Sequence, residues 1–168
     1  ILIEYISEFG IVETLSVLNG MFAFALFDKK TQNLHLARDY YGQKPLYYYH
    51  SSELFTFSSL LKDCINLSSN YPEINKRTAQ HGIQFGMSLL PETIVSGIFE
   101  VPPGYLLTLC IHDSYAIVKS FFDLKSRIRS NFQSLTCGQS FFDQLSNSIS
   151  RHLVADCEIG LLLSGGID

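Results

Sequence analysis

The sequence predicts an α+β fold, in which an antiparallel, strand-rich part is followed by the first helix and strand of a second, parallel-sheet domain. Short apolar runs separated by turn residues fill residues 20–121. A helical period follows over 139–153, and an apolar run over 158–163 leads into Ser164-Gly165-Gly166-Ile167-Asp168. The 168 residues suit one domain, or one domain and a piece of another.

Two helices and a hairpin are expected first. Residues 1–9 carry apolar side chains at helical spacing up to Gly10, and residues 12–17 continue as a short second helix. Residues 20–28 alternate large and small apolar side chains, which is typical of a strand covered on both faces. Residues 34–38 return as the hairpin partner of that strand.

A tight connection over 39–45 precedes the remaining elements. The helices expected here are a helical turn at 58–64 and a helix over 75–85, for which Asn75 is a suitable N-cap. Polar residues 124–138 lack a strong period and are expected to form a linker. Extended segments are expected over 46–50, 54–58, 94–99, 106–111 and 115–121.

Composition excludes several classes of function. The net charge of −4, with scattered Lys and Arg, gives no electrostatic case for binding nucleic acid. No apolar stretch approaches the roughly 20 residues that span a bilayer. The histidines show no metal-ligand spacing, and the cysteines contain no C-x-x-C pair. Free, mostly buried thiols in a reducing cytoplasm are therefore expected, with a catalytic thiol as the alternative; the cysteines are Cys64, Cys110, Cys137 and Cys157.

The residues 164–168 have the composition of a phosphate-binding loop. A buried strand, a turn of small residues and a helix N-terminus together hold phosphate, because glycines let the backbone approach closely and its free N–H groups point at the oxygens. An ordinary strand-to-helix turn is the structural alternative. The pattern predicts a nucleotide-binding loop at this position.

Five motifs, in order across nearly the whole chain, resemble the glutamine-hydrolysing asparagine synthetase family. Any one of them alone would be weak, but five in register are specific. They are Leu18-Asn19-Gly20-Met21-Phe22-Ala23-Phe24-Ala25-Leu26-Phe27-Asp28, Ala37-Arg38-Asp39-Tyr40-Tyr41-Gly42-Gln43-Lys44-Pro45-Leu46-Tyr47-Tyr48, Phe57-Ser58-Ser59-Leu60-Leu61-Lys62, Val101-Pro102-Pro103-Gly104-Tyr105 and Leu163-Ser164-Gly165-Gly166-Ile167-Asp168.

The resemblance implies a two-domain cytoplasmic enzyme. Its amidotransferase domain, an α-β-β-α sandwich of the N-terminal-nucleophile fold, releases ammonia from glutamine. Its ATP pyrophosphatase domain, of the adenine-nucleotide α-hydrolase-like type, uses ATP and Mg²⁺ to convert aspartate through β-aspartyl-AMP into asparagine. By this resemblance, residues 1–123 are the C-terminal part of a glutamine amidotransferase domain, 124–138 are a linker and 139–168 begin the synthetase domain. A homodimer is compatible with the family.

The resemblance also implies which residues bind the nucleotide. Leu163 corresponds to the family's nucleotide-contacting leucine, and Ser164, Gly165 and Gly166 to its pyrophosphate loop. Asp168 corresponds to the loop aspartate, expected near phosphate and magnesium. The family's nucleophilic cysteine would precede Ile1, and both chain ends read as excision points. The stretch is therefore expected to hold no catalytic residue and, by itself, not to hydrolyse glutamine.

Several alternatives stay open at the level of sequence. Arg38 and Asp39 could line a glutamine pocket, or form a structural ion pair or turn hydrogen bonds. The tyrosines at 40, 41, 47, 48 and 49 could stack on a base, or pack the sandwich. A relative of the same architecture could act on another carboxylate, and a non-catalytic remnant is a third option. A sandwich without its first strands would expose apolar faces and self-associate.

Overall fold

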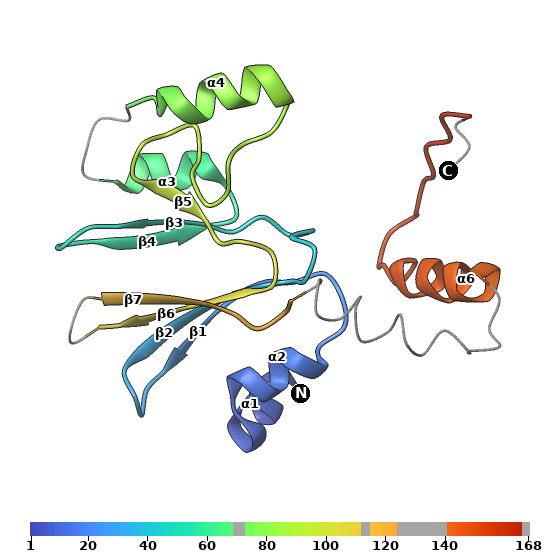
Figure 1. The fold of residues 1–168 in the computed structure, drawn as a ribbon. Coiled ribbons are helices and arrows are strands. Elements are labelled where there is room, and N and C mark those ends of the chain that lie inside the picture. The colour runs from blue at the N-terminus through green and yellow to red at the C-terminus, as the bar shows by residue number, and fades with distance from the viewer. Residues whose placement is uncertain (69–72, 112–114, 124–140, 166–168) are drawn as a thin grey trace. The chain divides into compact units, whose positions relative to one another are not determined.

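The computed structural model describes residues 1–68, 73–111, 115–123 and 141–165 (Figure 1). They belong to two compact units, Ile1–Leu124 and Lys125–Asp168. No helix of the described residues is long and apolar enough to cross a membrane.

Two antiparallel sheets form the centre of the first unit (Figure 1). The four-stranded sheet has the order β1-β2-β6-β7, and the three-stranded sheet has the order β4-β3-β5. The strands are β1 (Ala23–Asp28), β2 (Asn33–Arg38), β3 (Tyr47–His50), β4 (Phe55–Ser58), β5 (Ile98–Glu100), β6 (Tyr105–Cys110) and β7 (Tyr115–Ser120). Every pair of neighbours is antiparallel, as the alternating patterns and short turns predict.

Helices cover the outer faces of the two sheets (Figure 1). On the side of the four-stranded sheet lie α1 (Leu2–Phe9) and α2 (Ile11–Val17), separated by Gly10 at φ 84. On the side of the three-stranded sheet lie α3 (Leu61–Leu67) and α4 (Lys76–Phe85). The first unit is therefore layered α-β-β-α, and the predicted antiparallel α+β architecture is confirmed.

The helix over 75–85 begins as predicted. The Asn75 side chain accepts a hydrogen bond from the backbone N–H of Thr78, and the helix ends at Gly86 in the left-handed conformation, φ 73. The side-chain amide of Asn75 also donates to the Glu92 carboxylate at 3.1 Å. That contact ties the start of α4 to the segment that leads into β5.

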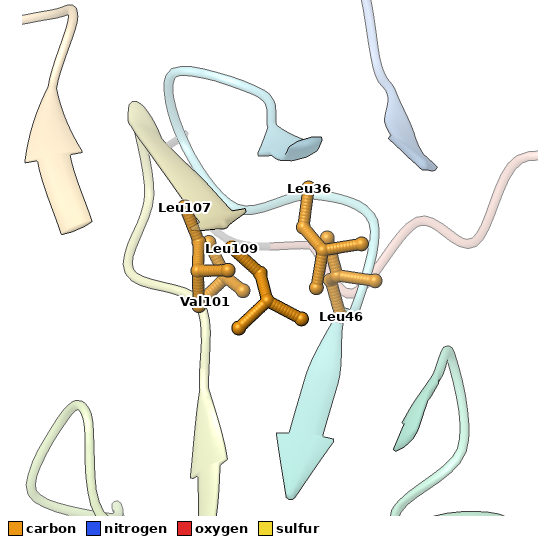
Figure 2. Packing of buried hydrophobic residues seen from close by; sticks show 5 residues of the cluster. All are labelled: Leu36, Leu46, Val101, Leu107 and Leu109. Carbon is orange, nitrogen blue, oxygen red and sulfur yellow. The ribbon is translucent and has the colours of Figure 1, made fainter. Parts of the chain in front are cut away.

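The main core lies between the sheets. Side chains alternate between the two faces of a strand, so one face of β2 and β6 packs against the three-stranded sheet. Leu46 and Val101, which flank strands β3 and β5 of that sheet, belong to the same hydrophobic cluster. Figure 2 shows the cluster, which consists of Leu36, Leu46, Val101, Leu107 and Leu109. Smaller clusters join each sheet to its helices, around Leu15 for α2 and around Cys64 for α3. The first two clusters bury apolar side chains on both faces of β2 and β6.

The first strand departs from its predicted environment. Its alternating apolar residues predict cover on both faces, but β1 lies at the edge of its sheet and leaves Ala25 and Phe27 exposed. Phe24, on the other face, packs with the Leu15 cluster against α2. The prediction is wrong for one face because cover depends on which elements lie beside the strand, and composition does not encode that.

The second unit contains the predicted helix but not the predicted strand. Helix α6 spans Phe141–His152, in agreement with the helical period. Residues 158–163, predicted as a strand, form none. A parallel strand obtains its hydrogen bonds from neighbouring strands, and the described residues of this unit contain no other strand to provide them. The linker predicted over 124–138 lies outside the described residues.

Candidate functional site

Arg38 ends β2 and points into the first unit, where it is only 5% exposed. Its Nε donates to the carbonyl of Lys44, and its two terminal nitrogens donate to the carbonyls of Val101 and Gly42, all at 2.8 Å. Nη1 also forms an ion pair with the Glu100 carboxylate at 2.6 Å. The planar guanidinium is the side chain that can serve so many acceptors in one plane.

Asp39 is fully buried and folds the following turn around its carboxylate. Oδ1 accepts from the backbone N–H groups of Tyr41 and Gln43 at 3.1 and 2.9 Å, and Oδ2 accepts from that of Lys44 at 2.9 Å. Hydrogen bonds of this kind fix an Asx-type turn and stabilise the charged carboxylate. The Asp39 backbone also takes part, because its carbonyl accepts from Gly104 N–H at 2.9 Å.

Gly42 is required by this arrangement for two reasons. Its φ of 66 lies in the left-handed region, which side chains other than glycine rarely adopt. A Cβ at this position would also lie 2.8 Å from Cγ of Pro103 and 3.0 Å from Cζ of Arg38. The turn glycine therefore lets the loop close onto the Arg38 side chain.

The cluster of Arg38, Asp39, Gly42 and Glu100, called the Arg38–Asp39 hub below, is a structural device. Its donors and acceptors are directed at backbone atoms of three segments, so they are engaged within the protein. The structure supports the structural interpretation over a glutamine pocket, with one correction: the ion-pair partner of Arg38 is Glu100, while Asp39 holds the turn. The partner sits 62 positions away in the chain, so sequence spacing could not identify it.

Tyr47, Tyr48 and Tyr49 pack within the sandwich, as one alternative proposed, whereas Tyr41 is 65% exposed. Tyr48 stacks near Phe55 with ring centroids 6.1 Å apart and lies 5.6 Å from Phe99. Burial raises the pKa of Tyr48 above its ordinary value. The pKa of Tyr47, next to the hub, is also raised, mainly by burial and to a smaller extent by the negative charge of Glu100. These phenols therefore remain neutral packing groups at physiological pH.

The predicted nucleotide loop is described only in part. Leu163 and Ser164 are exposed, and Gly165 adopts a left-handed φ of 74. Gly166 and Asp168 lie outside the described residues, so the proposed magnesium contact of Asp168 stays a prediction. Among the described residues, no group of three or more His, Cys, Asp or Glu side chains could hold a metal ion.

A pocket that the sequence analysis did not predict opens at the start of β2, away from Arg38 at its end. It has a volume of about 290 Å³ and lies between the ends of β2 and β6 and the β3–β4 turn. Apolar side chains, including Leu34, Phe55 and Leu109, form its walls, and His50 and Glu53 are its titratable groups.

The described cysteines differ in exposure. Cys64 is fully buried, and burial raises the pKa of its thiol, whereas Cys157 is exposed. Because the thiolate is the reactive form, iodoacetamide at pH 7.5 is expected to alkylate Cys157 at least about 100-fold faster than Cys64. Peptide mass spectrometry over time measures both rates, and urea-unfolded protein, in which the two rates converge, is the control. Rapid labelling of Cys64 in the native protein would contradict this prediction and support the alternative of a catalytic thiol.

Comparison with known proteins identifies the first unit. Residues 1–121, more than half of the chain, match the family model of the glutamine amidotransferase domain. The chain belongs to this family. The match ends one residue after β7, so it includes the strands of both sheets and the helices α1 to α4.

Relatives to which this chain is similar are named asparagine synthetases. It is 31% identical over 161 residues to asparagine synthetase [glutamine-hydrolyzing] 1 of Bacillus subtilis, covering 93% of this chain and 24% of that protein. It is 32% identical to asparagine synthetase 3 of the same organism, with 90% and 24% coverage, and 27% identical to the human enzyme, with 100% and 29% coverage. The resemblance predicted from the motifs is confirmed. The chain spans about a quarter of the length of these relatives.

Proposed function

We propose that this chain is part of a glutamine-hydrolysing asparagine synthetase. The parent reaction is the ATP-dependent amidation of aspartate to asparagine with glutamine-derived ammonia, through β-aspartyl-AMP. One observation carries the proposal: the similarity to asparagine synthetases does not stop with the amidotransferase match at residue 121 but covers 90–100% of the chain. A relative sharing only the amidotransferase domain would match only the first unit.

We assign the two units to different domains of this enzyme. Residues 1–123 are assigned to the C-terminal part of an N-terminal-nucleophile amidotransferase domain, which the α-β-β-α layering supports. Residues 139–168 are assigned to the start of an ATP pyrophosphatase domain in a cytoplasmic enzyme. Glutamine, aspartate and ATP with Mg²⁺ are the proposed substrates and cofactor.

The loop after Leu163 is the proposed phosphate-binding element. Release of pyrophosphate from ATP develops negative charge, and fixed backbone N–H donors stabilise such charge without reorganisation. The left-handed conformation of Gly165 supports the assignment, because turns of this kind direct successive N–H groups toward an anion. Ser164 and Gly166 would add donors on either side of Gly165, and Asp168 would lie near the magnesium ion.

The loop assignment is tested in the protein made from its complete coding sequence. A Gly165→Ala substitution meets no atom within 4 Å, so its effect comes from the strained φ of 74 alone. We expect aspartate-dependent ATP–pyrophosphate exchange to fall by about 10-fold to 100-fold, with little change in thermal stability. Gly160→Ala is the matched control, because that glycine also has open space and lies in the same unit. Equal exchange rates for the two variants would contradict the loop assignment.

The identity of the acceptor is tested separately with labelled aspartate. Conversion of labelled aspartate to asparagine, dependent on ATP and glutamine, is the expected result. Activation of a different carboxylate with no asparagine would assign the protein to a relative of the same architecture. Absence of both half-reactions would make it a non-catalytic remnant.

A further inference from the structure

The segment by which the chain leaves the first unit is held in place beyond the end of β7. The backbone N–H of Phe121 donates to the carbonyl of Gly104 at 3.0 Å, and the Ser120 hydroxyl donates to the carbonyl of Phe122 at 2.8 Å. This exit segment, residues 121–123, is therefore bound to the Pro102–Gly104 turn rather than simply trailing from the strand.

Tyr40 holds the same segment through its aromatic ring. The ring centroid of Tyr40 lies 4.3 Å from that of Phe122 and 5.7 Å from that of Phe121. Its hydroxyl donates to the carbonyl of Leu15 at 2.7 Å, with the Ser16 carbonyl at 3.2 Å. Tyr40 thus joins the end of α2 to the exit segment, because its apolar ring and its polar tip bind different elements.

The exit segment is also linked to the Arg38–Asp39 hub. Gly104, which accepts from Phe121, donates its own N–H to the Asp39 carbonyl at 2.9 Å. The approach is close, since a Cβ on Gly104 would lie 3.0 Å from Cβ of Phe122, and the φ of Gly104 is 72. Tyr40 and the Gly104 turn therefore hold Phe121 and Phe122 directly, and the hub holds the Gly104 turn through the Asp39 carbonyl.

We propose that Tyr40 is a positioning residue that fixes the point where the chain leaves the amidotransferase unit and thereby couples the two half-reactions. The first part rests on the contacts alone, and the second rests on the proposed function. If ammonia made by one unit is to be used by the other, the two units need a defined relation during transfer. The exit segment begins the covalent connection between them, and loosening it would release ammonia to solvent.

The attachment is tested by amide hydrogen exchange in peptides that cover residues 115–123. Tyr40→Ala removes both the ring contacts and the hydroxyl, and is expected to speed exchange of the Phe121 amide about tenfold. Tyr40→Phe keeps the ring and is expected to change it by less than about threefold. Tyr115→Ala, at the exposed start of β7, is the matched control and should leave the Phe121 amide unchanged. Unchanged exchange in Tyr40→Ala would overturn the proposal.

The coupling is tested in the complete protein by the ratio of glutamine hydrolysed to asparagine formed. In Tyr40→Ala and in the milder Phe122→Leu, we expect this ratio to rise at least about threefold while ammonium-dependent asparagine formation is retained. A purely structural role would lower all activities together and leave the ratio unchanged, which would overturn the coupling. If the wild-type protein forms no asparagine, the proposed function and with it the coupling fail, whereas the exchange experiment still decides the attachment.

Discussion

Replacing Arg38 with methionine is expected to lower the free energy of unfolding of the first unit by about 3–5 kcal/mol. The substitution removes the donors for the carbonyls of Lys44, Val101 and Gly42 and leaves the Glu100 carboxylate, which is half-buried, without its counter-charge. Burying groups that have lost their partners costs far more than the intact pair contributes. Urea unfolding followed by circular dichroism measures the change as a lower midpoint at constant slope.

Two further variants separate the causes of that loss. Arg38→Lys keeps the charge but cannot serve all four acceptors, so it is expected to lose most of the same stability. Adding Glu100→Gln to Arg38→Met should recover part of the loss, because the uncompensated charge is gone. Lys119→Met, at an exposed position of β7, is the control and should change the free energy by less than about 0.5 kcal/mol. A loss below about 1 kcal/mol for Arg38→Met would mean that the hub does not hold the sandwich.

The layered fold follows from local pattern because burial and side-chain direction share one periodicity. In β6, Leu107 and Leu109 face the core between the sheets, while Leu106 faces α2 from the other side. Alternation with period 2 gives this division directly, and the turn residues around Gly104 separate the strands. The described elements of residues 1–123 are therefore of the types that the sequence predicts, with shifted bounds at α3 and β5.

The burial of a strand face and the pairing of a strand are not local properties, and the predictions that depend on them are wrong. Whether Phe27 is covered depends on which elements lie beside β1. Whether residues 158–163 form a strand depends on other strands that could pair with them. A run such as Leu161-Leu162-Leu163 has the composition of a buried strand wherever it lies. Whether it becomes one is decided by residues distant in sequence.

The sequence left two roles open for Arg38 and Asp39, and the fold decides between them in favour of the structural one. A carbonyl carries no signature in its residue type, so nothing marks Val101 and Lys44 as acceptors for Arg38. A buried charged pair and a pocket for a polar substrate have the same composition. Only the convergence of backbone atoms from separate segments distinguishes the two, and that convergence is a property of the folded chain.

Replacing Asp39 with asparagine is expected to destabilise the first unit by about 1.5–3 kcal/mol, although the two side chains have the same shape. An asparagine oxygen can still accept from Tyr41 and Gln43, but its amide would then point at the Lys44 N–H and set donor against donor. Flipping the amide would restore one contact and lose two. Asp39→Ala, which removes all three acceptor contacts, should cost more than Asp39→Asn in the same urea experiment.

The matched control for Asp39 is another aspartate that holds a turn. Asp28 accepts from the Lys30 N–H at 2.8 Å and the Thr31 hydroxyl at 2.8 Å, and these hydrogen bonds, that of Thr31 first, lower the pKa of its carboxyl. It lies in an exposed hairpin where water replaces a lost partner, so Asp28→Asn should cost clearly less than Asp39→Asn. Equal losses for the two would show that the turn geometry, and not burial of the Asp39 carboxylate, decides the stability of the hub.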